Sequence, residues 1–330
     1  MTFAWIERLE GVSRAEWDSV LFASERPSPF LSRQFLVPWV GAFAAGRPVR
    51  IGRWESGGRA RGLVFLYRRA DSGGWELMGG EDVADSLDAA VVKGAEGEFW
   101  DAFLRSSREL LAEGPLFLPN LVTGAPSLAI LPRLCDTLGY ALTVEEMDRS
   151  PFVPIPVSYE SYLESLGKKN RHELRRKVRR AGDALPGLAF RVVATREELS
   201  RDFPSFVDLH RKSHAGKRDF MDGRMEGFFR EAAEAFLDAG WLRLAFLSSG
   251  TRDVAAAFQL AWRGALMLYN SGYDPEKREA SPGVVLVARC IEDAIRLGMR
   301  EYDFLRGRER YKYDLGGRDR IVSKAIVRLP

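Results

Sequence analysis

Residues 265–316 read ALMLYNSGYDPEKREASPGVVLVARCIEDAIRLGMREYDFLRGRERYKYDLG and carry the most information about fold and chemistry. The pattern predicts an apolar strand over 265–271, a polar loop, a helix over 283–297 and a short strand over 302–305. The start of a helix presents backbone N–H groups without intrahelical partners and the positive end of the helix dipole. This junction between loop and helix is therefore suited to a diphosphate.

The loop ends in the pattern Arg-x-x-Ser-x-Gly, formed by Arg278, Ser281 and Gly283. Small residues let the backbone approach an anion, and Arg278 would add a direct positive charge. Pro282 is compatible with a first helical turn. The alternative is structural: Ser281 caps the helix, Pro282 occupies its first turn, and no ligand binds.

The elements expected before and after residue 150 follow the same order. Each half is expected to hold a strand, two helices, three strands, a helix and a further strand, and each then continues to a last strand. Two halves of similar length with one element order indicate a tandem duplication. The expected fold class is α/β (α+β), with two domains over 1–150 and 151–330, each a mixed, mostly antiparallel sheet flanked by helices.

Composition excludes several classes of protein. Of the 330 residues, 46% are apolar and 29% are charged, which excludes disorder as the dominant state. The two cysteines exclude a disulfide scaffold and a zinc site built from cysteine, and they favour the reducing cytoplasm. Four prolines interrupt the long uncharged stretch 114–132, so it is not a continuous membrane helix. Charges within the first ten residues argue against a secretory signal.

Charge is distributed unevenly along the chain. The net charge is +3, but residues 1–150 hold 16 basic and 21 acidic side chains, whereas the remaining residues hold 33 and 25. The second half is therefore expected to meet an anionic partner. Its densest basic segment, 168–180, has Leu174, Val178 and Ala181 spaced as a helical apolar stripe, and a solvated helix is the simplest interpretation.

The loop and helix resemble a degenerate form of the GNAT acyltransferase signature, Arg/Gln-x-x-Gly-x-Gly/Ala, with Ser281 in place of the first glycine. The wider pattern resembles the CelD-like acyltransferases associated with bacterial exopolysaccharide genes, relatives of the FemAB-like peptidyltransferases, which carry two GNAT-like domains in tandem. The segments that carry this resemblance are Gly272-Tyr273-Asp274-Pro275, Ser281-Pro282-Gly283, Tyr302-Asp303-Phe304-Leu305-Arg306-Gly307 and Tyr311-Lys312.

The resemblance implies an acyl-CoA site between the fourth and fifth strands of the second domain. The pyrophosphate would bind Arg278, Ser281, Gly283, Val284 and Val285. Backbone N–H groups near Asn270 or Ser271 would polarise the thioester carbonyl, because donors placed where negative charge develops stabilise the transition state. No metal is expected.

Catalytic roles follow from the same resemblance. Asp303 on the fifth strand is expected to take the proton of the acceptor, with Asp274 as the alternative base and a structural ion pair as the alternative role for Asp303. Lys312 would stabilise the oxyanion or hold an anionic donor. Tyr311, or else Tyr313, would protonate the leaving thiolate; packing with a bonded hydroxyl is the alternative.

The acceptor side is expected to include His214, Arg218, Tyr273 and Asp274. His210 and His214 stand four residues apart, but no third ligand accompanies them, so a metal site is not predicted. Surface placement is the alternative for His214 and Arg218.

The resemblance assigns different tasks to the two domains. Residues 79–88 stand where the first domain would need a phosphate loop and are acidic, so the domain over 1–150 is expected to be degenerate and to wall the acceptor groove. The basic segment 168–180 could contact coenzyme A, a tRNA or an anionic membrane surface.

The function expected is that of a cytoplasmic, bacterial acyltransferase acting on an amine or hydroxyl, with a sugar, a lipid-linked acceptor or a cell-envelope precursor as the acceptor. One alternative is a Fem-like transferase that uses aminoacyl-tRNA. The other is an inactive scaffold that binds a nucleotide or a protein.

Overall fold

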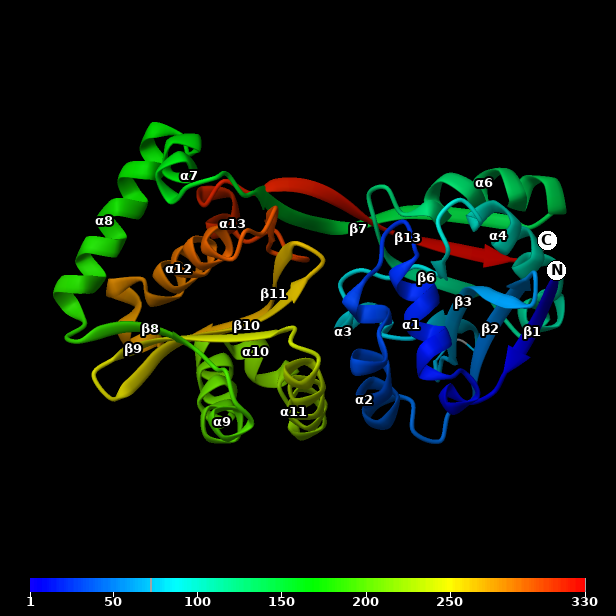
Figure 1. The fold of residues 1–330 in the computed structure, drawn as a ribbon, viewed down its shortest axis with the longest axis horizontal. Coiled ribbons are helices and arrows are strands. Elements are labelled where there is room, and N and C mark those ends of the chain that lie inside the picture. The colour runs from blue at the N-terminus through cyan, green and yellow to red at the C-terminus, as the bar shows by residue number, and fades with distance from the viewer. Residues whose placement is uncertain (72, 330) are drawn as a thin grey trace. The chain divides into compact units, whose positions relative to one another are not determined.

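The computed structural model describes residues 1–71 and 73–329 and divides into two compact units (Figure 1). Unit 1 comprises Met1–Asp148 and Ile321–Pro330, and unit 2 comprises Arg149–Arg320. Pro330, the end of the expected second domain, lies outside the described residues.

Unit 1 contains a sheet with the strand order β1-β2-β3-β4-β6-β13. Its strands are antiparallel except for the parallel pair of β4 and β6. The elements are β1 (Thr2–Ile6), α1 (Arg14–Phe22), α2 (Arg33–Phe43), β2 (Val49–Ser56), β3 (Arg59–Arg68), β4 (Trp75–Leu77), α3 (Gly80–Val83), β5 (Ala90–Val91), α4 (Glu96–Ser106), α5 (Arg108–Ala112), β6 (Leu116–Val122), α6 (Pro126–Leu138) and β13 (Arg318–Arg328).

Unit 2 repeats this arrangement with the order β7-β12-β11-β10-β9-β8, in which β11 and β12 form the parallel pair. Its elements are β7 (Ala141–Pro154, which begins in unit 1), α7 (Tyr159–Ser165), α8 (Lys168–Ala184), β8 (Leu188–Val192), α9 (Arg196–Ser213), α10 (Ala215–Phe220), α11 (Gly223–Asp238), β9 (Leu242–Ser249), β10 (Arg252–Trp262), β11 (Ala265–Tyr273), α12 (Pro282–Arg296), β12 (Glu301–Asp303) and α13 (Arg310–Asp314). The expected mixed, mostly antiparallel sheet flanked by helices is confirmed.

The last strand of the chain differs from its expected assignment. The last strand expected for the second domain is present as β13, but it pairs with β6, and its residues from Ile321 onward lie in unit 1. The sixth strand of unit 2 is instead the end of β7, where Phe152 is opposite Asp303. Pro151 and Pro154 lie within β7 although proline has no N–H to donate to a neighbouring strand. The carbonyl oxygen of Pro151 can still accept a hydrogen bond, and Phe304 N donates to it at 2.9 Å.

The sheet of unit 2 is covered on both faces. Helices α9, α10 and α11 lie below it in Figure 1, and α12 lies above it. The apolar stripe of α12, which includes Leu286, Cys290 and Ile291, packs in the core with Tyr302 of β12. Helix α12 is thereby fixed on the sheet with its first turn beside β11.

Candidate functional site

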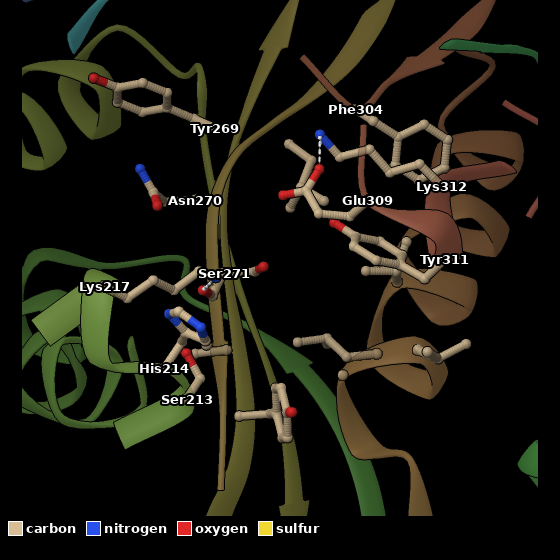
Figure 2. Close-up of a pocket in the computed structure, with 18 of the residues that line it drawn as sticks. Ser213, His214, Lys217, Tyr269, Asn270, Ser271, Phe304, Glu309, Tyr311 and Lys312 are labelled. Atoms are coloured by element: carbon tan, nitrogen blue, oxygen red, sulfur yellow. Dashed lines mark hydrogen bonds and ion pairs between the residues drawn. The ribbon is translucent and has the colours of Figure 1, made fainter. Parts of the chain in front are cut away.

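A pocket of about 540 Å³ lies in unit 2 among β11, α10 and the starts of α12 and α13 (Figure 2). This volume is typical of a site for a small molecule. Its cations are Lys217, Arg306 and Lys312, against the single carboxylate of Glu309. The pocket is therefore suited to an anionic or electron-rich ligand.

The pocket opens where two parallel strands separate. The register between β11 and β12 ends at Met267 and Asp303, whereas β11 continues to Tyr273. Opposite β10, Phe258 pairs with Asn270 and Gln259 with Leu268, so Tyr269 is the extra residue of a β-bulge. Bulges redirect the backbone and are common next to active sites. The predicted wedge between the fourth and fifth strands is present.

Asn270 and Ser271 point in opposite directions because successive strand residues alternate. The Asn270 amide oxygen accepts from His210 Nε2 at 2.8 Å. Ser271 and Tyr311 both line the pocket, and the Ser271 hydroxyl acts to lower the pKa of Tyr311. The stretch of β11 without a β12 partner therefore contacts both α9 and the α13 region.

The loop after β12 holds the lysine of the expected catalytic set. Lys312 is only 3% exposed, and its Nζ donates to the carbonyl oxygens of Leu305, Arg306 and Gly307 at 3.3, 2.8 and 3.2 Å. It also forms an ion pair of 3.0 Å with Glu309 (Figure 2). Lys312 thus fixes this loop as well as placing a positive charge on the pocket wall.

Backbone conformation explains how these carbonyls converge. Leu305 has φ 53° and Gly307 has φ 117°. A φ of 117° is rarely adopted by residues with a side chain, so Gly307 allows this conformation, and a Cβ there would also displace Glu309 Oε2 at 2.5 Å and Lys312 Nζ at 3.0 Å. A buried leucine in the left-handed region costs about 1–3 kcal/mol, and such strain is concentrated at functional sites.

Tyr311 lies beside this lysine with its hydroxyl directed towards β11 (Figure 2). Its ring contacts Phe304 edge to face, with 6.2 Å between centroids. Burial and the negative charge of Glu309 raise the pKa of Tyr311 above its usual value. The phenol is therefore kept protonated and can donate a proton.

The opposite wall comes from α10. Lys217 Nζ donates to the Ser271 carbonyl oxygen at 2.6 Å. Burial lowers the pKa of Lys217, and the nearby Lys312 lowers it further, whereas Glu309 opposes the shift. His214 also lines the pocket, and its Nδ1 accepts from Gly216 N at 3.1 Å at the start of α10.

The structure brings eight of the predicted site residues into this one pocket. They are Asn270, Ser271, Tyr273, Gly283, Val284, His214, Tyr311 and Lys312.

The start of α12 differs in detail from the expected anion loop. Ser281 has φ 54°, and its hydroxyl accepts from Arg180 at 3.0 Å instead of capping the helix. Val285 N donates to the Ser281 carbonyl at 3.1 Å and its side chain is in the core, so its amide is already used. Gly283 and Val284 line the pocket, and their N–H groups precede that first helical bond, so they have no partner within the helix.

The structure places four other predicted residues outside the pocket. Arg278 is exposed on a 3₁₀ turn over Pro275–Ala280, and Asp274 begins that turn by accepting from Glu276 N at 3.0 Å. Arg218 is exposed on α10. The local backbone decides where these side chains point. Their spacing in the sequence therefore does not place them in the wedge between β11 and β12.

Asp303 is the fourth, and it is held by structural partners. Its Oδ2 lies 3.1 Å from Arg320, and its Oδ1 accepts from Leu305 N at 2.8 Å. Burial raises the pKa of Asp303 to about 6, although Arg320 opposes this. The carboxylate supports the loop after β12 and does not face the pocket, so the geometry corresponds to the structural ion pair considered above.

In unit 1, the position that corresponds to the pocket of unit 2 is occupied by a segment of unit 1 itself. Asn120 lies within β6 and has a left-handed backbone with φ 58°, as Leu305 has after β12. Its side-chain nitrogen donates to the carbonyls of Gly80, Glu81 and Ala84 at 3.2, 3.1 and 2.8 Å. The acidic segment that replaces a phosphate loop is therefore bound to the strand.

Sequence reasoning missed Lys217, Glu309 and His210. Lys217 meets Ser271 across 54 residues, and His210 meets Asn270 across 60, so no local pattern reveals either contact. Glu309 lies three residues before Lys312, a spacing at which helical side chains meet, and this signal could have identified the ion pair.

Comparison with known proteins concerns the fold of the chain. Residues 168–313 match the family model described as Acetyltransferase (GNAT) domain. No curated protein matches the chain. Among the described residues, none of the helices is sufficiently long and apolar to span a bilayer.

Solved structures extend the likeness to both units. FemX is similar with 13% identity and a TM-score of 0.67, over 98% of this chain and 96% of that one. A conserved protein of unknown function from Bacteroides thetaiotaomicron has 13% identity and a TM-score of 0.65 over 100% of both chains. A tandem GNAT protein from the clavulanic acid biosynthesis pathway has 12% identity and a TM-score of 0.51 over 98% of both.

Unit 2 carries a GNAT domain, and the whole chain has a Fem-like tandem GNAT fold. The predicted resemblance to Fem-like tandem GNAT proteins and the predicted fold class are confirmed.

Proposed function

We propose that this protein is an acyltransferase that moves an acyl group from acyl-CoA to an amine or hydroxyl acceptor. One observation carries the proposal: Tyr311 and Lys312 face the unpaired stretch of β11 in a single pocket, and that pocket reaches the first amides of α12. A protonated phenol, a cation and an open strand edge are the groups that thioester aminolysis or alcoholysis requires.

The donor is proposed to lie along this wedge. The N–H groups of Gly283 and Val284, with the dipole of α12, would bind a phosphate of the coenzyme. The thioester carbonyl would lie beside Asn270 and Ser271, where backbone N–H groups stabilise the developing oxyanion. Lys312 adds positive charge on the same wall.

Two proton transfers complete the reaction. The acceptor N–H or O–H attacks the carbonyl carbon, and its proton passes to the neutral amine of Lys217. The tetrahedral intermediate then breaks its C–S bond, and Tyr311 gives its proton to the thiolate. The lowered pKa of Lys217 supports its role as the base, and the raised pKa of Tyr311 means that the phenol still holds its proton when the thiolate leaves. We assign the base to Lys217 because Asp303 lies outside the pocket.

For the acceptor we propose a sugar or a cell-envelope precursor, supported by the sequence resemblance to CelD-like acyltransferases. His214 and Tyr273 line the same pocket and are the residues we assign to its binding.

Thermal shift with acetyl-CoA and longer acyl-CoAs tests the proposal. A ligand at 100 times its dissociation constant should add about 2.7 kcal/mol to the free energy of unfolding. Val284→Glu should keep the fold, because a carboxylate in the first helical turn is favourable there, but it should repel the phosphate and abolish the shift. Val284→Gln introduces a side chain similar in size to glutamate but without charge, so this variant should retain the thermal shift.

A wild-type protein that no acyl-CoA stabilises would contradict the proposal. That result would favour aminoacyl-tRNA as donor, or a scaffold without turnover.

A further inference from the structure

A second pocket of unit 2 lies among α8, the start of α12 and α13 and has a volume of about 430 Å³. Val284 lines this pocket and also the acyl pocket, so the two adjoin at the first turn of α12. A ligand that extends past Val284 would enter both.

The second pocket is lined by more positive than negative side chains. Lys169, Arg176, Lys177 and Arg310 face Glu173 and Asp314. Glu173 is engaged by Arg176 through hydrogen bonds of 2.8 and 2.7 Å and lies 3.9 Å from Lys177. Glu173 therefore neutralises Arg176 and leaves most of the Lys177 charge unbalanced.

Two further positive side chains have little or no negative charge beside them. Arg310 Nε lies 3.8 Å from Asp314 in an exposed pair, which is worth little. Lys169 has no ion-pair partner within 1–71 and 73–329. The charges of Lys169, Lys177 and Arg310 are thus available to an incoming anion.

Positive groups also mark the junction between the two pockets. Arg180 of α8 reaches Ser281 at the start of α12, and its buried Nε has no hydrogen-bond partner in the part of the chain that the structure describes. The helix dipole of α12 points to the same place. Positive potential therefore continues from Gly283 and Val284 into the pocket under α8.

We propose that the pocket between α8 and α13 binds the phosphorylated ribose at the far end of a nucleotide-linked acyl donor, through Lys169, Lys177 and Arg310. The inference rests on the proposed function for the identity of the donor. The acyl pocket takes the thioester, the α12 amides take the central phosphates, and the terminal phosphate reaches the second pocket. Lysine and arginine are the side chains that bind phosphate.

The lining favours recognition of phosphate over recognition of a base. Among the described residues that line the second pocket, His172 carries the one aromatic ring, and none is Phe, Tyr or Trp. Single-stranded RNA is usually held by stacking successive bases on several rings, and one exposed histidine does not form such a platform. The volume is that of a small-molecule site, so we commit to a mononucleotide end of the donor rather than to RNA.

Calorimetric titration with adenosine 3′,5′-bisphosphate and with 5′-AMP tests this inference. We expect the bisphosphate to bind the wild-type protein about tenfold more tightly, equivalent to about 1.4 kcal/mol. Lys169→Ala/Lys177→Ala should remove the preference. Arg179→Ala should preserve it, because Arg179 is exposed on the same helix and does not line the pocket. Thermal melts of each variant would show that it is folded.

A wild-type protein that does not distinguish the two nucleotides, or a double variant with the wild-type preference, would overturn the inference. So would tight binding of a tRNA minihelix that depends on Arg175 and Arg179 and is indifferent to Lys169 and Lys177.

The probes contain no thioester, so the two proposals can fail separately. Bisphosphate binding without acyl-CoA turnover would support the second pocket and contradict the proposed reaction. Turnover of acyl-CoA with no preference between the two nucleotides would support the proposed reaction and contradict the proposed role of the second pocket.

Discussion

Lys217 Nζ lies 2.6 Å from the carbonyl oxygen of Ser271, so the amine of α10 is fixed against the open edge of β11. One N–H of the amine is used by this bond, and the nitrogen otherwise faces a pocket whose other wall carries Glu309 and Lys312. Burial favours the neutral amine most strongly, Glu309 opposes it, and the Lys312 charge supports it. This placement is the reason that we propose Lys217 as the proton acceptor.

The rate of acyl transfer should therefore rise with pH until Lys217 is neutral. Because the pKa of Lys217 is lowered from 10.5, the rising limb of kcat/KM should be centred below that value. Lys217→Met should lower kcat by about 100-fold, the usual minimum for loss of a general base, and remove the limb. Thiol release measured across the pH range checks both effects.

Lys212 offers a matched control for this profile. It stands at the end of α9, is 57% exposed and is paired with Asp208 at 2.6 Å. Lys212→Met should leave the limb in place. An unchanged limb in Lys217→Met would exclude Lys217 as the base.

Lys312→Met should reduce turnover and loosen the loop after β12. The thioether cannot donate to the three carbonyls that Lys312 Nζ now satisfies, and each carbonyl left unpaired costs about 1–3 kcal/mol. Loss of the positive charge should lower kcat by roughly 100-fold. Single-turnover rates, together with unfolding midpoints and acyl-CoA affinity, separate the two effects. A folded variant with wild-type turnover would contradict the role of Lys312.

His210 should make the protein sensitive to acid. Burial and the charge of Lys217 lower the pKa of His210 to about 4 from 6.5, so between these values the unfolded chain binds more protons than the folded one. The stabilisation is complete above pH 6.5 and is lost as pH falls towards 4, with a total of roughly 3 kcal/mol. Urea unfolding at several pH values measures it.

His210→Gln should flatten this dependence, since glutamine can still donate to Asn270 but does not titrate. The exposed His172 provides the control, and His172→Gln should keep the wild-type slope. A slope that survives in His210→Gln would show that another group causes it.

Local patterns in the sequence predict much of this fold. The strand, loop and helix over 265–297 are present as β11, a 3₁₀ turn and α12, because apolar periodicity and the Ser-Pro-Gly start are local signals. The equal order of elements predicts the duplication. The one helix expected after the three strands of the first half is divided into α4 and α5 at Ser107, whose hydroxyl donates to the Phe103 carbonyl.

The candidate site could be predicted only in part. The resemblance to GNAT and Fem-like transferases predicts Tyr311, Lys312, Asn270 and Ser271, because its motifs lie in the segment 265–316. Lys217 was missed because its contact depends on how α9 and α10 pack on β11. Asp303 was expected to face the pocket, but Arg320, distant in sequence, holds its carboxylate.

The carbonyl ¹³C resonance of bound [1-¹³C]acetyl-CoA tests the central claim most directly, because it reports on the atom that the wedge between β11 and α13 is proposed to polarise. The account predicts a downfield shift on binding to the wild-type protein, with return to the free position in Val284→Glu. A resonance that stays at its free position with saturating wild-type protein would contradict it.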